Sequence, residues 1–201
     1  WVDSKKIINK NNIKLLKQIG INKNDKLCLM LATYEKRKGH DFLLNAFLEV
    51  SKKIPNSKLL ISGFGSKDEK KHIRSLISSL KLSKSVFLTD FQEDIDTLIN
   101  RSSVVILPSQ RLESFGYVLI EAMLRKKPTI GTNIGGIPEV IKNNSTGYII
   151  DKSDVSMLSE KIITILSDPK IAYMFGIEGN KYYLKNFTAK KMSENYYKLL
   201  K

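Results

Sequence analysis

The chain alternates between short apolar runs and segments in which apolar residues recur every three or four positions. Short apolar runs bounded by polar or glycine-rich residues predict buried strands, and the three-to-four spacing predicts helices that bury one face. The expected strands are 26–33, 58–62, 85–89, 103–107, 128–131 and 147–150. The expected helices are 4–19, 41–54, 68–80, 93–100, 117–126, 136–141, 154–166, 170–184 and 188–200.

Strand and helix follow one another six times along the chain. This alternation predicts an α/β fold with a doubly wound, parallel, six-stranded Rossmann-like sheet and helices on both faces. Ligands in such folds bind at the carboxyl ends of the strands, where the strand order reverses. Polar and glycine-rich loops follow the strands at 33–39, 63–67, 90–93, 109–116 and 132–136. We therefore expect a single domain over residues 1–201, with a ligand site built from these loops.

The composition is that of a globular domain with one sizeable core, because 42% of the 201 residues are hydrophobic and 27% are charged. No apolar stretch is long enough to span a bilayer, and no secretory signal opens the chain. The chain begins with Trp1, and we expect it to be part of a longer protein. The single cysteine, Cys28, lies in an apolar run, which predicts a core residue and suits a reducing compartment.

The net charge of +14 is concentrated at the two ends of the chain. Residues 1–30 hold seven lysines against two acids, and residues 181–201 hold six lysines against one acid. Such clusters favour an anionic membrane surface, and a coding bias towards lysine, asparagine and isoleucine explains them equally well. Nucleic-acid binding would need cations interleaved with aromatic residues or a known motif, and we find neither.

The segment after the fourth expected strand carries two carboxylates. The strand stops at Pro108, Glu113 follows in the loop, and a Ser-Phe-Gly turn at 114–116 leads into a helix that contains Glu121. A helix that begins just past a parallel strand directs free N–H groups and its positive dipole end at the crevice. A carboxylate placed there repels phosphate, so Glu113 needs another role, and binding the sugar end of a sugar nucleotide would be one.

The loop after the first expected strand carries three cations, Lys36, Arg37 and Lys38. They lie at a strand's carboxyl end and before a helix, which predicts an anion site. Lys38 can offer a point charge and Arg37 a planar fork to a diphosphate. The alternative is a solvated basic loop.

Two further loops are rich in glycine. The Gly-Phe-Gly segment at 63–65 is too short for a dinucleotide fingerprint, so it indicates either a turn or a close backbone approach to a ligand. After the fifth expected strand, Gly135 and Gly136 allow the backbone to approach a ligand or a neighbouring loop. Asn133, just before them, could reach a sugar hydroxyl.

Metal chemistry is not expected from the acidic and imidazole side chains. Asp94 and Asp96 resemble the acidic clamp of some sugar transferases, but they lie in a helical segment, where residues two apart do not face each other. A solvated helix start is the better interpretation. His72 has no second ligand nearby in the sequence.

Taken together, these segments resemble the nucleotide-sugar half of the family-4 retaining glycosyltransferases, which have a GT-B fold of two Rossmann-like domains facing a cleft. The resemblance covers nearly the whole chain. It is carried by 108–123, 127–128, 135–139 and 146–148, by the lysine–glycine loop and helix at 37–44, and by Val2-Asp3. It implies that the chain is the carboxyl-terminal, donor-binding domain and that the amino-terminal acceptor domain is absent from it.

The resemblance also implies the roles of the site residues. Glu113 and Lys38 are the implied catalytic pair: Glu113 would contact the donor sugar, and Lys38 would neutralise the leaving diphosphate. Glu121 would accept both ribose hydroxyls. The other implied donor-binding residues are Ser114, Phe115, Gly116, Tyr117 and Val118 at the turn and helix start, with Gly63 and Phe91 near the base. From their places in the loops, we add Thr33, Arg37 and Asn133 to the expected substrate-binding residues.

One position departs from the family pattern. The family usually has Gly-Arg-Leu after the first strand, and that arginine is a second cation for the diphosphate. Here Thr33 replaces it, and a neutral group cannot supply the charge. We hypothesise that Arg37, next to Lys38, compensates.

The implied reaction is transfer of a sugar, with retention, from a UDP- or GDP-sugar to a glycan or lipid-linked acceptor, without a metal or other cofactor. The family suggests bacterial surface-polysaccharide synthesis, in the cytoplasm or against the inner face of the membrane. The isolated domain is expected to bind the donor without turning it over. Two alternatives stay open: a non-catalytic sugar-nucleotide-binding module, and a sugar-nucleotide epimerase of related fold.

Overall fold

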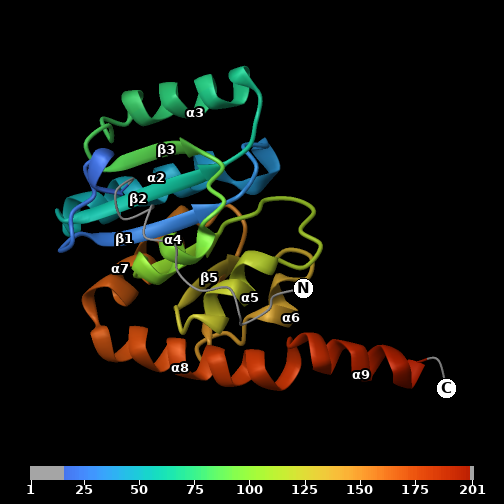
Figure 1. Cartoon of the computed structure of the whole chain (residues 1–201). Helices are drawn as coiled ribbons and strands as arrows, with labels where there is room; N and C mark the ends of the chain where they lie inside the picture. The colour runs from blue at the N-terminus through green and yellow to red at the C-terminus, as the bar shows by residue number, and fades with distance from the viewer. Residues whose placement is uncertain (1–15, 200–201) are drawn as a thin grey trace.

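The computed structural model describes residues 16–199 as a central sheet covered by helices on both faces (Figure 1). Residues 16–18 are helical, and the remainder of the helix predicted over 4–19 lies outside the described residues. Within the described part of the chain, no helix combines the length and the apolar composition needed to cross a membrane.

The sheet has six parallel strands in the order β3-β2-β1-β4-β5-β6. β1 and β4 are neighbours although β2 and β3 lie between them in the sequence, so the strand order reverses at this pair. The predicted doubly wound sheet is confirmed, and the β1–β4 boundary is where such folds bind ligands. The strands are β1 Lys26–Leu31, β2 Ser57–Gly63, β3 Val86–Asp90, β4 Val104–Leu107, β5 Thr129–Thr132 and β6 Gly147–Ile150.

Each face of the sheet has its own apolar layer, because successive strand residues point to opposite faces. Cys28 and Met30 of β1 join the cluster that contains α2, α3 and α7, whereas Leu27 and Leu29 join the cluster that contains α4 and α5. Burial raises the pKa of the Cys28 thiol, consistent with the predicted core residue. These helices are α2 His40–Lys53, α3 Lys67–Ser79, α4 Ile95–Arg101, α5 Tyr117–Leu124 and α7 Val155–Ser167.

Helix α8 (Pro169–Asn186) crosses beneath α5 and continues into α9 (Ala189–Leu199), as Figure 1 shows. Tyr183 of α8 joins an apolar cluster with residues of α5 and of α6 (Ile137–Val140). The Asn180 side-chain amide donates to the carbonyls of Met123 and Leu124 at 3.2 and 2.9 Å, which satisfies free acceptors at the end of α5. Helix α5 ends at Leu124, before the predicted residue 126, and Lys126 itself adopts a left-handed φ of 55°.

The other predicted boundaries lie within about two residues of the observed ones, and the differences have local causes. Strand β1 ends at Leu31 rather than Thr33, because the Thr33 hydroxyl bonds to Glu35 and the chain turns into a short 3₁₀ helix, η1 (Lys36–Lys38), which the sequence did not predict. Helix α4 begins at Ile95 rather than 93, because the Asp94 carboxylate caps it through the amide of Thr97.

Candidate functional site

Two loops at the switch point of the sheet face each other, one after β1 (33–39) and one after β4 (108–116). Gly39 has a φ of 81°, and a Cβ there would lie 2.0 Å from the carbonyl oxygen of Pro108, so only glycine allows this approach. The amide of Gln110 donates to the carbonyl of Arg37 at 2.7 Å. The backbone alone thus brings the cationic loop against the loop that carries Glu113.

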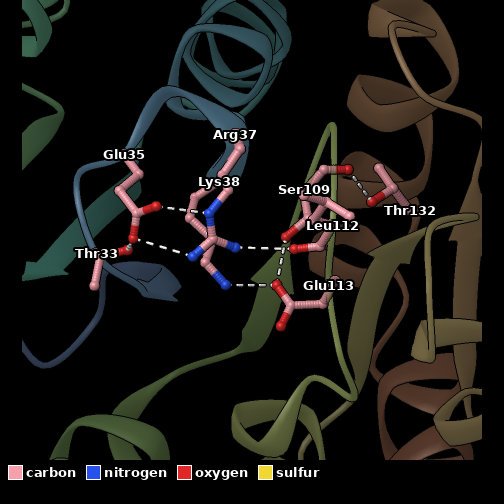
Figure 2. Close-up of polar contacts among 8 residues, drawn as sticks. All are labelled: Thr33, Glu35, Arg37, Lys38, Ser109, Leu112, Glu113 and Thr132. Atoms are coloured by element: carbon pink, nitrogen blue, oxygen red, sulfur yellow. Dashed lines mark hydrogen bonds and ion pairs between the residues drawn. The ribbon is translucent and has the colours of Figure 1, made fainter.

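Lys38 and Glu113 form an ion pair across these loops, with Nζ 2.6 Å from Oε2 (Figure 2). Their side chains are 13% and 10% exposed. The Ser109 hydroxyl donates to the same oxygen at 2.7 Å, while Oε1 has no hydrogen bond within the described chain. A largely buried pair is strongly oriented, and breaking it leaves one charge uncompensated. Glu113 therefore has one oxygen held in place and one free for a further donor.

The glycine pair after β5 packs against the backbone of Glu113. The amide of Gly136 donates to the carbonyl of Glu113 at 3.0 Å. A Cβ at Gly135 would lie 1.8 Å from that carbonyl oxygen, and the φ of Gly135 is 55°. The Thr132 hydroxyl donates to the carbonyl of Ser109, as drawn in Figure 2. Of the two predicted roles for the glycine pair, close approach to a neighbouring loop is the one observed.

The predicted turn between Glu113 and the next helix is present. Gly116 adopts a left-handed conformation, with φ 78° and ψ 51°, and α5 begins at Tyr117. The Phe115 ring packs edge-on against Tyr117 and Phe187, with centroid distances of 5.5 and 5.8 Å. The free N–H groups at the start of α5 therefore lie next to the Glu113 loop.

A pocket of about 310 Å³ opens beside these loops and reaches across the ends of β1 and β2 to α5. Among its lining residues are five that the sequence analysis expected to bind the donor: Thr33, Gly63, Phe91, Val118 and Glu121. The pocket also contains Phe64, whose ring stacks on that of Phe91 with centroids 4.6 Å apart.

Phe64 is a site residue that the sequence analysis missed. Phe64 and Phe91 are 61% and 46% exposed, and exposed apolar patches of this kind often mark binding sites. The sequence signal that could have identified Phe64 is its place between two glycines at the end of a strand, where ligand-binding loops of this fold lie. Gly63 itself approaches backbone, because a Cβ there would lie 1.8 Å from the carbonyl oxygen of Ala32.

Glu121 lies in the wall of this pocket and differs from Glu113 in its surroundings. Its carboxylate has no hydrogen-bond partner among the described residues, and only its backbone carbonyl accepts a bond, from Arg125. Burial raises the pKa of Glu121, Arg125 opposes this rise and Asp96 adds to it. Arg125 is itself paired with Asp96. The carboxylate is thus partly desolvated and has free acceptor sites.

Asp94 and Asp96 have structural roles, but the expected solvated helix start is only partly observed, because the Asp96 side chain is 16% exposed. Asp94 caps α4, and Asp96 pairs with Arg125 of α5. Over residues 16–199, no group of three or more His, Cys, Asp or Glu side chains is placed to hold a metal ion.

Arg37 and Asn133 have partners away from the pocket. The Arg37 Nε and Nη2 donate to Glu35 at 2.6 and 3.0 Å, and Nη1 donates to the carbonyl of Leu112 at 2.9 Å (Figure 2). Asn133 is exposed, with its amide 3.4 Å from Asp151. Neither residue lines the pocket. Compensation by Arg37 for the missing family arginine stays a prediction.

The fold and these loops define a Rossmann-like domain with a cleft site, and comparison with known proteins identifies its family. The family described as glycosyl transferases group 1 matches residues 11–182, so the chain belongs to that family. It corresponds to the carboxyl-terminal domain of the GT-B glycosyltransferases of family 4, which confirms the resemblance.

Two curated relatives illustrate the match. N-acetyl-alpha-D-glucosaminyl L-malate synthase of Bacillus anthracis is 29% identical over 196 residues, which cover 98% of this chain and 50% of that protein. The capsular polysaccharide biosynthesis glycosyltransferase CapM of Staphylococcus aureus is 31% identical over 150 residues, covering 73% and 38%. The chain spans about half the length of the first of these and less of the second.

Solved structures of glycosyltransferases have the same fold as this chain. A glycosyltransferase from Rickettsia africae superposes with a TM-score of 0.88 at 26% identity, over 96% of this chain and 52% of that one. The carboxyl-terminal domain of a group 1 protein (LpcC) from Francisella tularensis superposes with a TM-score of 0.76 at 21% identity, over 90% and 95%. The second match confirms the predicted fold as one half of a GT-B architecture.

Proposed function

We propose that this domain binds a nucleoside-diphosphate sugar at the β1–β4 switch point. We also propose that, together with an amino-terminal half, it transfers the sugar to an acceptor with retention. The observation that carries the proposal is the arrangement of two carboxylates around the start of α5. Glu121 lines a 310 Å³ pocket with free acceptor sites, and Glu113 is held by Lys38 on the adjacent loop. A sugar nucleotide needs acceptors for ribose and sugar hydroxyls, with donors for phosphate between them.

Each end of the donor has a proposed partner. Glu121 accepts the two ribose hydroxyls, and the base lies near Gly63 and Phe91. The amides of Tyr117 and Val118 at the start of α5 face the diphosphate, where the helix dipole favours negative charge. At the other end, Glu113 accepts from the sugar through its free Oε1.

The same turn completes the sugar end. The backbone of Ser114, Phe115 and Gly116 holds the sugar from the side of α5, and Asn133 offers an amide from the neighbouring loop. Lys38 stabilises charge on the leaving diphosphate. Catalysis then rests on positioning and electrostatic stabilisation, and Glu113 orients the sugar without attacking it.

Relatives support the choice of donor and acceptor class. Solved structures of Anabaena HepE hold UDP or UDP-glucose, and a mannosyltransferase of Mycolicibacterium smegmatis is GDP-mannose-dependent. We therefore propose a UDP- or GDP-sugar donor and, with CapM in view, a glycan or lipid-linked acceptor in surface-polysaccharide synthesis. We further propose that the protein acts in the cytoplasm or at the inner face of the membrane, where nucleoside-diphosphate sugars would be available to it.

A thermal-shift screen of the 201-residue chain against UDP-, GDP- and ADP-sugars tests donor binding, because a ligand of the folded state raises the melting temperature. We expect one nucleotide class to raise it and no transfer by the isolated chain. A panel without any shift would contradict the proposal. Isomerisation of the donor without acceptor would indicate an epimerase. A fusion of this chain to an amino-terminal half should transfer sugar, and the same fusion with Glu113→Ala is the control that should not. If the unmodified fusion also failed to transfer sugar, the domain would be a binding module.

A further inference from the structure

Arg37 connects the two site loops through both its side chain and its backbone. Its guanidinium donates to Glu35 with two nitrogens and to the carbonyl of Leu112 with the third (Figure 2). Its own carbonyl accepts from the amide of Gln110 at 2.7 Å. The loop from Gln110 to Leu112 is thus held at both ends by one residue, and Glu113 follows directly.

Apart from Arg37, the loop is anchored at its start, where the Gln110 side-chain oxygen accepts from the Ser153 amide at 3.1 Å, whereas its Leu112 end has less support. Leu112 has a φ of 41°, a left-handed conformation that is costly for a residue with a branched side chain. Its side chain is 81% exposed, so packing does not stabilise this conformation. The hydrogen bond from Arg37 to the Leu112 carbonyl, and that from the Gly136 amide to the Glu113 carbonyl, are therefore what fix the backbone here.

Glu35 and Thr33 orient Arg37. The Thr33 hydroxyl donates to Glu35 Oε1 at 2.7 Å, and the Arg37 fork occupies both oxygens of the same carboxylate. The hydrogen bonds from Arg37 and Thr33 hold the pKa of Glu35 below its usual range. An exposed pair of this kind contributes little to stability, but a bidentate fork fixes direction. The charge of Arg37 is thereby paired with Glu35, on the far side of the loop from the pair that Lys38 makes with Glu113.

We infer that Arg37 is a positioning residue, which holds the Gln110–Leu112 loop so that Glu113 meets the donor sugar, and that Thr33 and Glu35 keep it in that orientation. This inference rests on the proposed function and refines it. It assigns Arg37 to the sugar end of the site instead of the diphosphate. Thr33, at the position of the absent family arginine, then acts through Glu35 and Arg37.

Isothermal titration calorimetry with UDP-glucose and with UDP separates the two roles. GDP-mannose and GDP replace these probes if the thermal-shift screen selects guanine. If Arg37 positions Glu113, Arg37→Ala weakens UDP-glucose about tenfold and leaves UDP within about twofold, because Glu113 contacts only the sugar. Arg37→Lys behaves in the same way, since lysine keeps the charge but lacks the fork. Glu35→Gln weakens UDP-glucose in the same direction by a smaller factor.

A direct diphosphate contact predicts a different pattern. Arg37→Ala would then weaken UDP and UDP-glucose equally, Arg37→Lys would restore most of the affinity, and Glu35→Gln would strengthen both ligands by releasing the guanidinium. That pattern would overturn the inference. Lys36→Ala is the matched control, because it removes the same charge from the same turn. The Lys36 side chain has no hydrogen bond or ion pair within the described residues, and its backbone carbonyl, which accepts from the Gly39 amide, remains in the variant.

Hydrogen exchange gives a second readout that needs no ligand. The Gly136 amide donates to the Glu113 carbonyl, so loosening of the loop exposes it. We expect Arg37→Ala to accelerate its exchange at least about tenfold and Lys36→Ala to leave it unchanged. Unchanged exchange in Arg37→Ala would contradict the positioning role. If the wild-type chain bound neither UDP nor UDP-glucose, the proposed function would fail, while the exchange result would still decide the loop's dependence on Arg37.

Discussion

Glu113 and Glu121, the two carboxylates of the site, lie in the same strand–loop–helix unit but differ in their hydrogen-bond partners. Glu113 already has Lys38 and Ser109 on one oxygen and two glycines packed behind its backbone. Glu121 lines the pocket, its carboxylate has no partner in the described chain, and burial raises its pKa. If the proposed roles hold, the sugar end is preorganised in the protein, whereas the ribose end depends on the ligand for its hydrogen bonds.

Gly135→Ala tests the claim that the sugar end is built in advance. The new Cβ would meet the carbonyl oxygen of Glu113 at 1.8 Å, and alanine is strained at a φ of 55°. We expect a loss of about 3 kcal/mol or more in the free energy of unfolding, measured by urea denaturation. Gly20→Ala is the matched control. Its φ is 86° and its nearest contacts are at 3.9 Å, so it carries the backbone strain without the clash. Equal losses for the two variants would contradict the account.

His40→Phe tests how the buried residue that follows the 33–39 loop affects folding stability. The ring of His40 is buried against Tyr34, and neither nitrogen has a hydrogen bond of good geometry in the described chain. Burial lowers its pKa from 6.5 to about 4. Below pH 6.5 the unfolded chain takes up a proton that the folded chain resists, so folding stability falls as pH drops towards 4, by about 3 kcal/mol in total.

The phenylalanine variant should lack this part of the pH dependence. The measurement is the free energy of unfolding at several pH values between 7 and 4 for the two proteins. The difference between them should grow steadily below pH 6.5. A constant difference over this range would show that His40 titrates normally in the folded chain.

Glu121→Gln should produce the largest loss of nucleotide affinity. Replacing the carboxylate removes two charge-assisted hydrogen bonds to ribose, and we expect UDP to bind about 100-fold more weakly by calorimetry. The wild-type protein should lose a similar factor for 2′,3′-dideoxy-UDP, and the variant should lose little more with that analogue. Additive losses for the variant and the analogue would show that Glu121 does not contact ribose.

The raised pKa of Glu121 makes donor binding sensitive to mild acid. A protonated carboxyl accepts ribose hydroxyls poorly, so affinity for UDP-glucose should fall as pH drops through a pKa above the usual glutamate range. A sugar nucleotide is the proper probe, because its diphosphate stays ionised over this range. Glu121→Gln should flatten the profile. A wild-type profile that stays flat down to the ordinary glutamate range would contradict the assignment.

Ser109→Ala should have the smallest effect. The Ser109 hydroxyl shares Glu113 Oε2 with Lys38, which remains in the variant. We expect UDP-glucose affinity to fall about five-fold, close to 1 kcal/mol for one hydrogen bond, with UDP unaffected. The buried Ser102→Ala, whose hydroxyl bonds only to the carbonyl of Ile99, is the control for loss of a buried serine. An equal effect on UDP and UDP-glucose would argue against a role at the sugar end.

The sequence allowed the sheet, its helices and the loops of the site to be predicted, because apolar periodicity and strand-end glycines are local signals. Three features were beyond its reach. Arg37 and Leu112 lie 75 residues apart, so their bond depends on the strand order. The turn η1 follows from the side chains of Thr33, Glu35 and Arg37 acting together. Phe64 could not be placed in the pocket, since an exposed ring between glycines gives no burial pattern.

The most direct test is the ratio of UDP affinity to UDP-glucose affinity in wild type, Glu113→Gln and Glu121→Gln, measured by calorimetry. If Glu113 meets the sugar and Glu121 the ribose, Glu113→Gln weakens UDP-glucose about tenfold relative to UDP, whose affinity does not fall because the Lys38 charge is no longer paired, so the ratio changes. Glu121→Gln weakens both ligands by the same factor, so the ratio stays. A ratio that changed in Glu121→Gln, or stayed constant in Glu113→Gln, would contradict this division of the site.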